Sequence, residues 1–536
     1  MMLMPWLLVV FAFGILGFLV GVLTGMIPGF HVNNVVLIAL ACQGIMGGLC
    51  IALFGDGVLC ILPLSLAAFL VALAITHTFI TFIPAVFLGA PDESTALAVL
   101  PGHRMLLQGR GYEAVRLSAI GSMAGLLISF SILGIVRMVM GDPLNLYSGW
   151  VRSSAALLLI VIATILVMDE RPRGVGKGTV LCGILVKGGS EGCTRISQIP
   201  GNAPARVRGR VLRTSGEREL WVSDGTDEVH VRLRFGCAPP MGAEVTILGT
   251  MKREHTWRSW LRQRALALAV FLLAGGLGVL LLVPEGIAQL TFHILPVPHS
   301  DEGAVLLLPL FAGLFGLPML ILSLKGRARI PPQSTEVTPL NRREGLRSAA
   351  SGTLAGCITG WLPGISSAAA AVLAKHLSPR VERETEGFVL SVSAVNTANA
   401  VFNLLALFVI GRARSGAMKG VGTVLGAQLQ LWNDISAVPG ALVLLLCVVL
   451  LAALLSFSAT IWLGRRASKI LPRVPYRLLA LCAIATILMM VLIFSGTIGL
   501  LILPTATALG LLPPKIGVRR VHLMGCLIVP TVIFLL

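Results

Sequence analysis

The chain alternates between long apolar runs and short polar segments. A helix that crosses a membrane needs about 20 mostly apolar residues, and many of the runs have that length. Four others, 25–54, 89–107, 346–377 and 498–512, are interrupted by Gly and Pro, as in half-helices or re-entrant hairpins. We expect roughly 10–14 membrane-embedded helical segments on this length rule. The uninterrupted runs are Met4–Leu23, Ile61–Leu88, Ala114–Met140, Ser153–Met168, Ala265–Val283, Ala304–Leu324, Phe388–Ile410, Val438–Leu463, Leu478–Phe494 and Val521–Leu536.

The segment 204–254 departs from this pattern. Its apolar residues alternate with polar ones, as in Val207–Val211 and Val229–Leu233, and Gly and Asp separate the stretches. Such alternation predicts short strands, and their number favours a small all-β barrel of the OB-fold type. We therefore expect an N-terminal membrane repeat at 1–187, this insert at 204–254 and a C-terminal membrane repeat at 263–536.

The composition decides the class of protein. Of 536 residues, 56% are hydrophobic and only 12% are charged, whereas soluble proteins are about a quarter charged. A single soluble enzyme and a disordered chain are therefore excluded. An outer-membrane barrel is also excluded, because its strands would be short and alternating. The predicted fold class is an all-α polytopic membrane protein, in contact with membrane lipid, that carries a small all-β insert.

The distribution of charge predicts the topology. The chain has a net charge of +18, and basic clusters flank the β insert, with Arg171, Arg173 and Lys177 before it and Lys252 and Arg253 at its end. Lys and Arg are enriched in cytoplasmic loops. We therefore expect a multi-pass protein of a prokaryotic cytoplasmic membrane whose β insert lies in the cytoplasm.

A nine-residue motif occurs twice. Residues 21–29 read Gly-Val-Leu-Thr-Gly-Met-Ile-Pro-Gly and residues 356–364 read Gly-Cys-Ile-Thr-Gly-Trp-Leu-Pro-Gly, with five of nine positions identical at an offset of 335. Pro and Gly interrupt helices, and paired breaks in two halves of a membrane protein point to a transporter binding site. The motif predicts an inverted-repeat bundle with broken or re-entrant helices. The alternative is two ordinary helix–loop boundaries.

These stretches resemble the large permease of the tripartite tricarboxylate transporters, the TctA family. The resemblance covers 347–371 around the second motif, 310–318 before it, and 82–96, 100–105 and 109–114 in the first half. It implies a secondary transporter permease, not an enzyme, that moves a carboxylate-type organic anion with ion coupling. Its implied partners are a small membrane subunit and an extracytoplasmic binding protein, and a homodimer is a further option. The β insert departs from the family pattern and indicates a distant, archaeal branch.

The residues at the two breaks are candidates for binding a small anionic substrate. If half-helices follow the breaks, their N-termini present free N–H groups and partial positive charge, which suit a carboxylate or a phosphate. Plain N-capping is the alternative, because Asn and Ser are preferred caps. The candidates are Gly25, Pro28, Gly29, His31, Asn33 and Asn34 at the first break, and Gly360, Pro363, Gly364, Ser366 and Ser367 at the second.

Charged residues lie in a second hairpin of each half. The sequence Asp92-Glu93-Ser94-Thr95 follows an apolar run and is a candidate for binding a coupling Na⁺ or H⁺. Arg412 and Arg414 occupy the matching place in the C-terminal half, where they are candidates for contacting the anion. The alternative is a solvated interfacial loop without such a role.

Two further groups of polar residues lie inside apolar runs. Asn396, Asn399 and Asn403 share one helical face, which predicts either the lining of a polar cavity or interhelical hydrogen bonds. His77 stands in a long apolar run and is a secondary candidate for relaying protons, the alternative being a structural histidine.

Other functions remain as alternatives. The chain has no HExxH, GxSxG or Asp-rich motif, so we expect no catalytic residues, no metal site and no cofactor apart from the coupling ion. A translocase of a polyisoprenyl-phosphate or another lipid-linked anion would use the same helix ends. A membrane anchor for an OB-type module that binds protein or nucleic acid belongs to another class. Nucleic acid is disfavoured, because only Trp221 and Phe235 could stack on bases.

Overall fold

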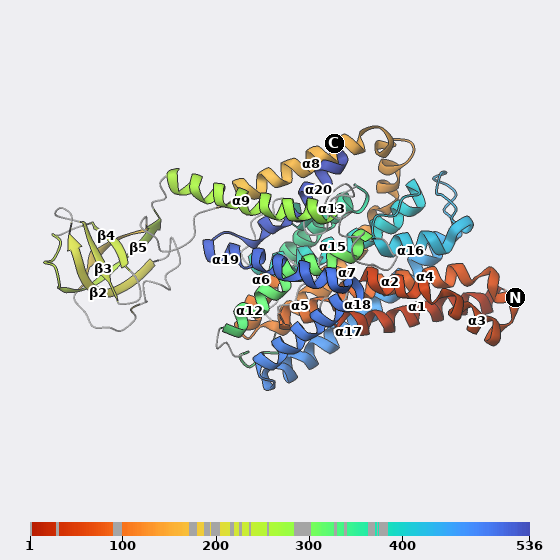
Figure 1. Ribbon diagram of the computed structural model, residues 1–536, viewed down its shortest axis with the longest axis horizontal. Coiled ribbons are helices and arrows are strands. Elements are labelled where there is room, and N and C mark those ends of the chain that lie inside the picture. The colour runs from red at the N-terminus through yellow and green to blue at the C-terminus, as the bar shows by residue number, and fades with distance from the viewer. Residues whose placement is uncertain are drawn as a thin grey trace. The chain divides into compact units, whose positions relative to one another are not determined.

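The computed structural model is mainly helical (Figure 1). The chain divides into two compact units. The membrane unit comprises Met1–Leu166, Phe271–Leu512 and Arg520–Leu536, and the sheet unit comprises Val167–Val270 and Pro513–Arg519. The structure describes residues 3–27, 32–88, 99–170, 179–186, 193, 204–214, 219–224, 228–234, 237–253, 257–282, 302–325, 330–336, 340–362, 370–371, 373–374 and 384–536.

Long apolar helices confirm a polytopic membrane protein. Within the described residues, seven helical segments are long and apolar enough to cross a membrane: Leu7–Gly25, Leu62–Leu88, Gly111–Met140, Trp260–Leu282, Thr385–Ile410, Gly440–Arg473 and Arg477–Ile516. Three predicted spans appear as shorter apolar helices, Ala155–Met168, Leu306–Leu322 and Arg520–Leu535.

The helices follow one another in this order: α1 (Leu3–Gly25), α2 (Val32–Ala41), α3 (Gln43–Phe54), α4 (Leu62–Ile80), α5 (Phe82–Leu88), α6 (Val99–Leu107), α7 (Gly111–Met140), α8 (Leu146–Met168), α9 (Trp257–Leu282), α11 (Glu302–Phe311), α12 (Leu317–Lys325), α13 (Arg342–Trp361), α15 (Glu384–Ile410), α16 (Gly416–Leu425), α17 (Gly440–Ile470), α18 (Tyr476–Gly510), α19 (Leu512–Ile516) and α20 (Gly525–Leu535). Short 3₁₀ or π turns lie at Asp56–Cys60, Ala312–Gly316, Gly426–Gln428, Leu471–Arg473 and Arg520–Met524.

The structure shows how two of the Gly- and Pro-interrupted runs fold. The run at 25–54 forms two short helices, α2 and α3. The run at 498–512 does not form a separate element, because it continues the predicted span 478–494 within α18. The helix is broken at Gly496, whose backbone has φ +59° and ψ −153°. Glycine occupies this region at little cost, because it has no Cβ.

The core of the membrane unit is built on two close helix pairs, α1 with α4 and α13 with α15. Glycines on α1 and α13 allow this approach. A methyl group at Gly17 would lie 2.2 Å from the carbonyl oxygen of Phe69, and one at Gly352 would lie 2.2 Å from that of Ser391. Small residues at helix interfaces let backbones pack directly in membranes.

A third helix packs on each pair, and it comes from the other half of the chain. α17 lies along α4 (Figure 1), where the Ser456 hydroxyl donates a hydrogen bond to Thr76 Oγ1 at 3.0 Å. α7 lies along α15, and Gly121 of α7 faces the Leu390 carbonyl of α15. The two halves are thus interleaved.

The two three-helix groups run in opposite directions. In the contacts among α1, α4 and α17, residue numbers increase in the same direction along each helix, so these three helices are parallel. The same holds among α7, α13 and α15. Between the groups the order reverses. Val115 near the start of α7 meets Gly464 near the end of α17, and Arg137 near the end of α7 donates to the Trp432 carbonyl, just before α17 begins.

The sheet unit contains five strands: β1 (Thr179–Leu185), β2 (Pro204–Thr214), β3 (Glu219–Ser223), β4 (Glu228–Leu233) and β5 (Glu244–Arg253). The order of pairing is β1-β4-β3-β2-β5, and β1 also pairs with β5. The β1–β4 pair is parallel and the others are antiparallel. The sheet is therefore mixed, and alternate side chains such as Val207, Val222 and Val231 form its own buried cluster.

The strands require a correction to the predicted boundaries. We expected the β segment to begin at 204 and the N-terminal membrane repeat to extend to 187, but residues 179–185 form strand β1. This stretch, Thr-Val-Leu-Cys-Gly-Ile-Leu, is a short apolar run without alternation. Hydropathy does not distinguish such a run from the end of a buried helix.

Candidate functional site

Corresponding residues of the two halves make corresponding contacts. Gly17, Gly21 and Gly25 on α1 match Gly352, Gly356 and Gly360 on α13 at the offset of 335. Each set lies against one face of the next long helix. Their partners on α4 and α15, such as Phe69 and Ser391 or Ile80 and Phe402, match at a second offset of 322. The sequence repeat therefore extends well beyond the nine-residue motif.

Side-chain hydrogen bonds repeat in the same register. The Thr24 hydroxyl donates to carbonyls four and three residues earlier at 2.9 and 3.4 Å, and the matching Thr359 hydroxyl does so at 3.1 and 3.2 Å. The Thr81 hydroxyl donates to the His77 carbonyl at 2.9 Å, and the amide of the matching Asn403 donates to the Asn399 carbonyl at 2.8 Å. Each half thus places three matched polar positions where its first helix ends.

The second-half cluster comprises Thr359, Gly360, Asn399, Asn403 and Arg414. Gly360 lies in the last turn of α13, and a methyl group on it would be 3.4 Å from the Asn399 carbonyl. The Arg414 guanidinium donates from Nη1 to the Thr359 carbonyl. A cation is favoured there because a helix C-terminus carries partial negative charge. Helix α15 and the loop that follows it, which carries Arg414, thus both contact the end of α13.

Asn403 has one unsatisfied polar atom. Its side chain is 3% exposed, and its Oδ1 has no hydrogen-bond partner among the residues that the structure describes. A buried acceptor left unpaired costs roughly 1–3 kcal/mol. The amide oxygen therefore marks a place suited to a donor or a cation. Asn396, two turns earlier, is buried, whereas Asn399, one turn earlier, is half-buried.

Arg412 does not join this cluster. Its guanidinium carbon lies 5.9 Å from the ring centroid of Tyr147 on α8, and the residue is exposed. Of the two predicted arginines, the structure thus brings only Arg414 to the end of α13.

The first-half cluster comprises Thr24, Gly25, His77 and Thr81. His77 is 3% exposed, and its Nδ1 lies 3.7 Å from the position that a methyl group on Gly25 would occupy. The imidazole therefore faces the last residue of α1. The preceding residue of α4, Thr76, accepts a hydrogen bond from the Ser456 hydroxyl of α17.

Several predicted site residues lie outside the described residues. They are Pro28, Gly29, His31, Asp92, Glu93, Ser94, Thr95, Pro363, Gly364, Ser366 and Ser367. Asn33 and Asn34 belong to α2, but their side chains are not described either. The roles assigned to all of these residues stay predictions.

Sequence reasoning missed the two threonines. Thr24 and Thr359 are the identical fourth residues of the two nine-residue motifs, so the signal was present in the repeat. Thr81 carried no such signal, because the 322 offset appears only in the contacts of α4 and α15.

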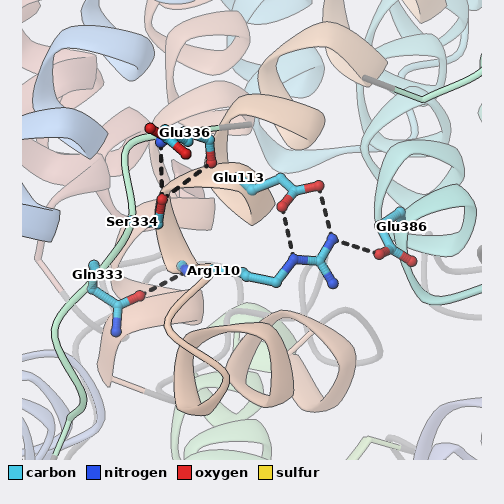
Figure 2. A network of polar contacts seen from close by, with 7 residues as sticks. Arg110, Glu113, Gln333, Ser334, Glu336 and Glu386 are labelled. Carbon is cyan, nitrogen blue, oxygen red and sulfur yellow. Dashed lines mark hydrogen bonds and ion pairs between the residues drawn. The ribbon is translucent and has the colours of Figure 1, made fainter. Parts of the chain in front are cut away.

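A second polar network joins the starts of α7 and α15 (Figure 2). Arg110 Nε and Nη2 donate to the two carboxylate oxygens of Glu113 at 2.8 Å each, and Nη2 also donates to Glu386 Oε1 at 2.6 Å. The Glu113 and Glu386 side chains are 2% and 8% exposed. These hydrogen bonds, that of Glu113 first, raise the pKa of Arg110 above its usual range, so the arginine stays charged.

The loop before α13 completes this network. Gln333 Oε1 accepts the backbone N–H of Gly111 at 2.7 Å, and its Nε2 donates to the Leu106 carbonyl at 3.0 Å. One side chain thus holds both ends of the turn between α6 and α7. Figure 2 shows the guanidinium of Arg110 between the two carboxylates. The network ties residues 276 positions apart, and so ties the two halves.

The chain was compared with known proteins. The family model described as the tripartite tricarboxylate transporter TctA family matches residues 11–192 and 241–525. The unmatched stretch between them contains β2, β3 and β4. An uncharacterised protein of the archaeon Methanocaldococcus jannaschii is 26% identical over 527 residues, which are 97% of this chain and 98% of that protein. No solved structure matches. Since the family model covers most of both membrane halves, the chain belongs to the tripartite tricarboxylate transporter TctA family.

Proposed function

We propose that the protein is an ion-coupled permease for a carboxylate-type organic anion, which binds where the two motifs interrupt the membrane. The observation that carries this proposal is the matched pair of helix ends, each with a threonine, a glycine and two polar positions on the adjoining helix. Paired broken helices mark the binding sites of secondary transporters. The name of the family points to tricarboxylates as the first substrates to test.

The two halves form an inverted repeat in this proposal. α1, α4 and α7 correspond to α13, α15 and α17, and each helix runs opposite to its counterpart, as the interhelical contacts require. A pseudo-two-fold axis in the membrane plane produces this relation. The axis would bring the two breaks together near the middle of the membrane. Spin labels at Pro28 and Pro363 would measure the distance between the two breaks. A distance that placed the two residues on opposite surfaces of the membrane would contradict this arrangement.

The anion would be held by donors from both halves. Arg414 supplies a fixed cation beside the end of α13, and Asn399 supplies a half-buried amide. The half-helix N-termini after Gly29 and Gly364, with Asn33, Asn34, Ser366 and Ser367, would add further donors. A helix N-terminus stabilises an anion by about 0.3–2 kcal/mol. Binding by such groups is moderate, which suits a carrier that must release its substrate.

The other assignments are part of the same proposal. Asp92 and Glu93 are candidates for the coupling cation. Following the family description, a small membrane subunit and a binding protein would complete the transporter. The sheet unit is proposed to be a cytoplasmic interaction module of the OB type. Its pairing supports this, because β2, β3 and β4 form a meander, β1 pairs with β4 in parallel, and β5 joins β1 to β2.

Transport by the purified protein tests the proposal. The protein would be reconstituted in liposomes and given radiolabelled di- and tricarboxylates under an inward proton or sodium gradient. Accumulation is expected, and Arg414→Gln should weaken it at least tenfold, since a hydrogen bond to a charged group contributes about 1.5–3 kcal/mol. Arg412→Gln is the matched control and should change uptake little. If no carboxylate accumulates while a polyisoprenyl-phosphate is translocated, the lipid-linked alternative replaces this one.

A further inference from the structure

We infer that His77 takes up and releases the proton that drives transport, so that the coupling ion is H⁺. This inference rests on the proposed function and names the coupling group within it. Its basis is an asymmetry between two sites that otherwise match in their backbone contacts and hydrogen bonds. Where the second half has Asn399, the first half has His77. The one position is permanently neutral, and the other carries an imidazole that can gain and lose a proton.

The residues that can carry positive charge beside the two helix ends also differ between the halves. In the second half, the permanent cation Arg414 donates to the Thr359 carbonyl at the end of α13. The sequence position that matches Arg414 at the 322 offset holds Asp92, so the first half has no arginine there. His77 instead faces Gly25, the last residue of α1. The second half thus has a fixed positive charge beside its helix end, and the first half has one that can be switched.

The surroundings favour the imidazolium only in part. The C-terminus of α1 carries partial negative charge, which stabilises a cation beside it, whereas burial in an apolar helix disfavours the charged form. A bound anion would add to the first influence, and proton uptake and substrate binding would then favour each other.

Titratable residues lie on some of the described elements packed against α4. α1, α2 and α5 carry none. The others are Asp56 and Cys60 on the turn Asp56–Cys60, Tyr112, Glu113, Arg116 and Arg137 on α7, Glu384 and Glu386 on α15, Lys419 on α16, and Cys447, Arg465, Arg466 and Lys469 on α17. The residue facing His77's turn from α17 is the neutral Ser456.

The step itself is a proton transfer without other chemistry. One ring nitrogen of the neutral imidazole accepts a proton from water on one side of the membrane, and an N–H bond forms. After the change of access, that bond breaks and the proton passes to water on the other side. Each cycle moves one proton with one anion, so the transported charge is one unit more positive than that of the anion alone.

The variant His77→Asn tests the inference, because it installs the residue that the matching site already has. In liposomes, the wild type should accumulate the carboxylate when a pH gradient is imposed. The variant should still exchange labelled for unlabelled substrate across the membrane. It should lose accumulation driven by the pH gradient, and the dependence of exchange on pH between about 5 and 8 should flatten. His522→Asn, at another buried histidine, is the matched control and should keep both properties.

Each outcome decides between distinct conclusions. Accumulation by His77→Asn under a pH gradient would overturn the inference, as would a wild type driven by sodium alone. Loss of accumulation in Asp92→Asn with Glu93→Gln, but not in His77→Asn, would assign coupling to those acids. If His77→Asn does not fold, His77→Gln is used, and the pH profile of exchange alone decides. A wild type that moves no carboxylate under any gradient refutes the proposed function instead.

Discussion

The Arg110 network gives the sharpest test of how the two halves are held together. In Arg110→Gln, the carboxylates of Glu113 and Glu386 lose the cation that lies between them, although their side chains are only 2% and 8% exposed. Breaking a buried ion pair on one side costs roughly 3–5 kcal/mol, because a charge is left uncompensated. Arg110 is itself 29% exposed, so water can partly replace it. We therefore expect the lower end, about 3 kcal/mol.

A second variant separates the two bonds of the network. Glu386→Gln removes one charge-assisted hydrogen bond but keeps the two-bond contact between Arg110 and Glu113. The expected loss is about 1.5 kcal/mol, at the lower end for hydrogen bonds to charged groups. In the double variant, the losses should not add, and we expect a coupling of about 1 kcal/mol or more, since the residues are in direct contact.

The free energy of unfolding would be measured by SDS titration in mixed micelles, followed by tryptophan fluorescence. Arg208→Gln is the matched control. Its pair with Glu244 has the same 2.8 Å distance but is 43% and 60% exposed, and water and salt screen such exposed pairs, which contribute little to stability. If Arg110→Gln were as stable as Arg208→Gln, the reasoning from burial would be wrong. An additive double variant would show that Arg110 and Glu386 do not interact in the folded protein.

Three further predictions concern packing, the site and the sheet unit. Gly352→Ala should greatly reduce the yield of folded protein, because the methyl group would lie 2.2 Å from a backbone oxygen, whereas Gly134→Ala, with nothing within 4 Å, should be tolerated. Isothermal titration with a tricarboxylate should show that Asn399→Ala weakens binding severalfold, and unchanged binding would remove this residue from the site. Replacing 179–253 by a short linker should leave a protein that inserts in membranes, whereas removing only 204–253 should cause aggregation, because β1 would lose its partners.

The sequence predicted the class of fold because long apolar runs have few other structures available to them. The length rule located α1, α7 and α15 to within a few residues, whereas the predicted span 61–88 covers both α4 and α5, and α17 continues beyond the predicted end at 463. Short segments were harder, since β1 is an apolar run of seven residues whose partners lie about 50 and 70 positions away. The local pattern of such a run does not show that it pairs with other strands.

The candidate site was only partly predictable from the sequence. The repeat identified Gly25 and Gly360, and the amide face identified Asn399, because both signals are periodic. The contact of Arg414 with Thr359 spans 55 positions and that of Arg110 with Glu386 spans 276. Such contacts depend on how the helices pack, and no local pattern encodes that packing. The same reason explains why Arg412 and Arg414, two positions apart, have different surroundings.

The described parts of the two breaks are helix C-termini, and this matters for how an anion could bind. C-terminal carbonyls repel an anion, so α1 and α13 alone would make a poor anion site. Arg414 offsets that repulsion at α13 by donating to the Thr359 carbonyl. At α1, the corresponding contribution would come from His77 only when it is protonated. An anion would then find both helix ends compensated in the protonated state and only one in the neutral state. The repeat can thus supply the two binding sites, while the difference between His77 and Asn399 supplies the dependence on the proton.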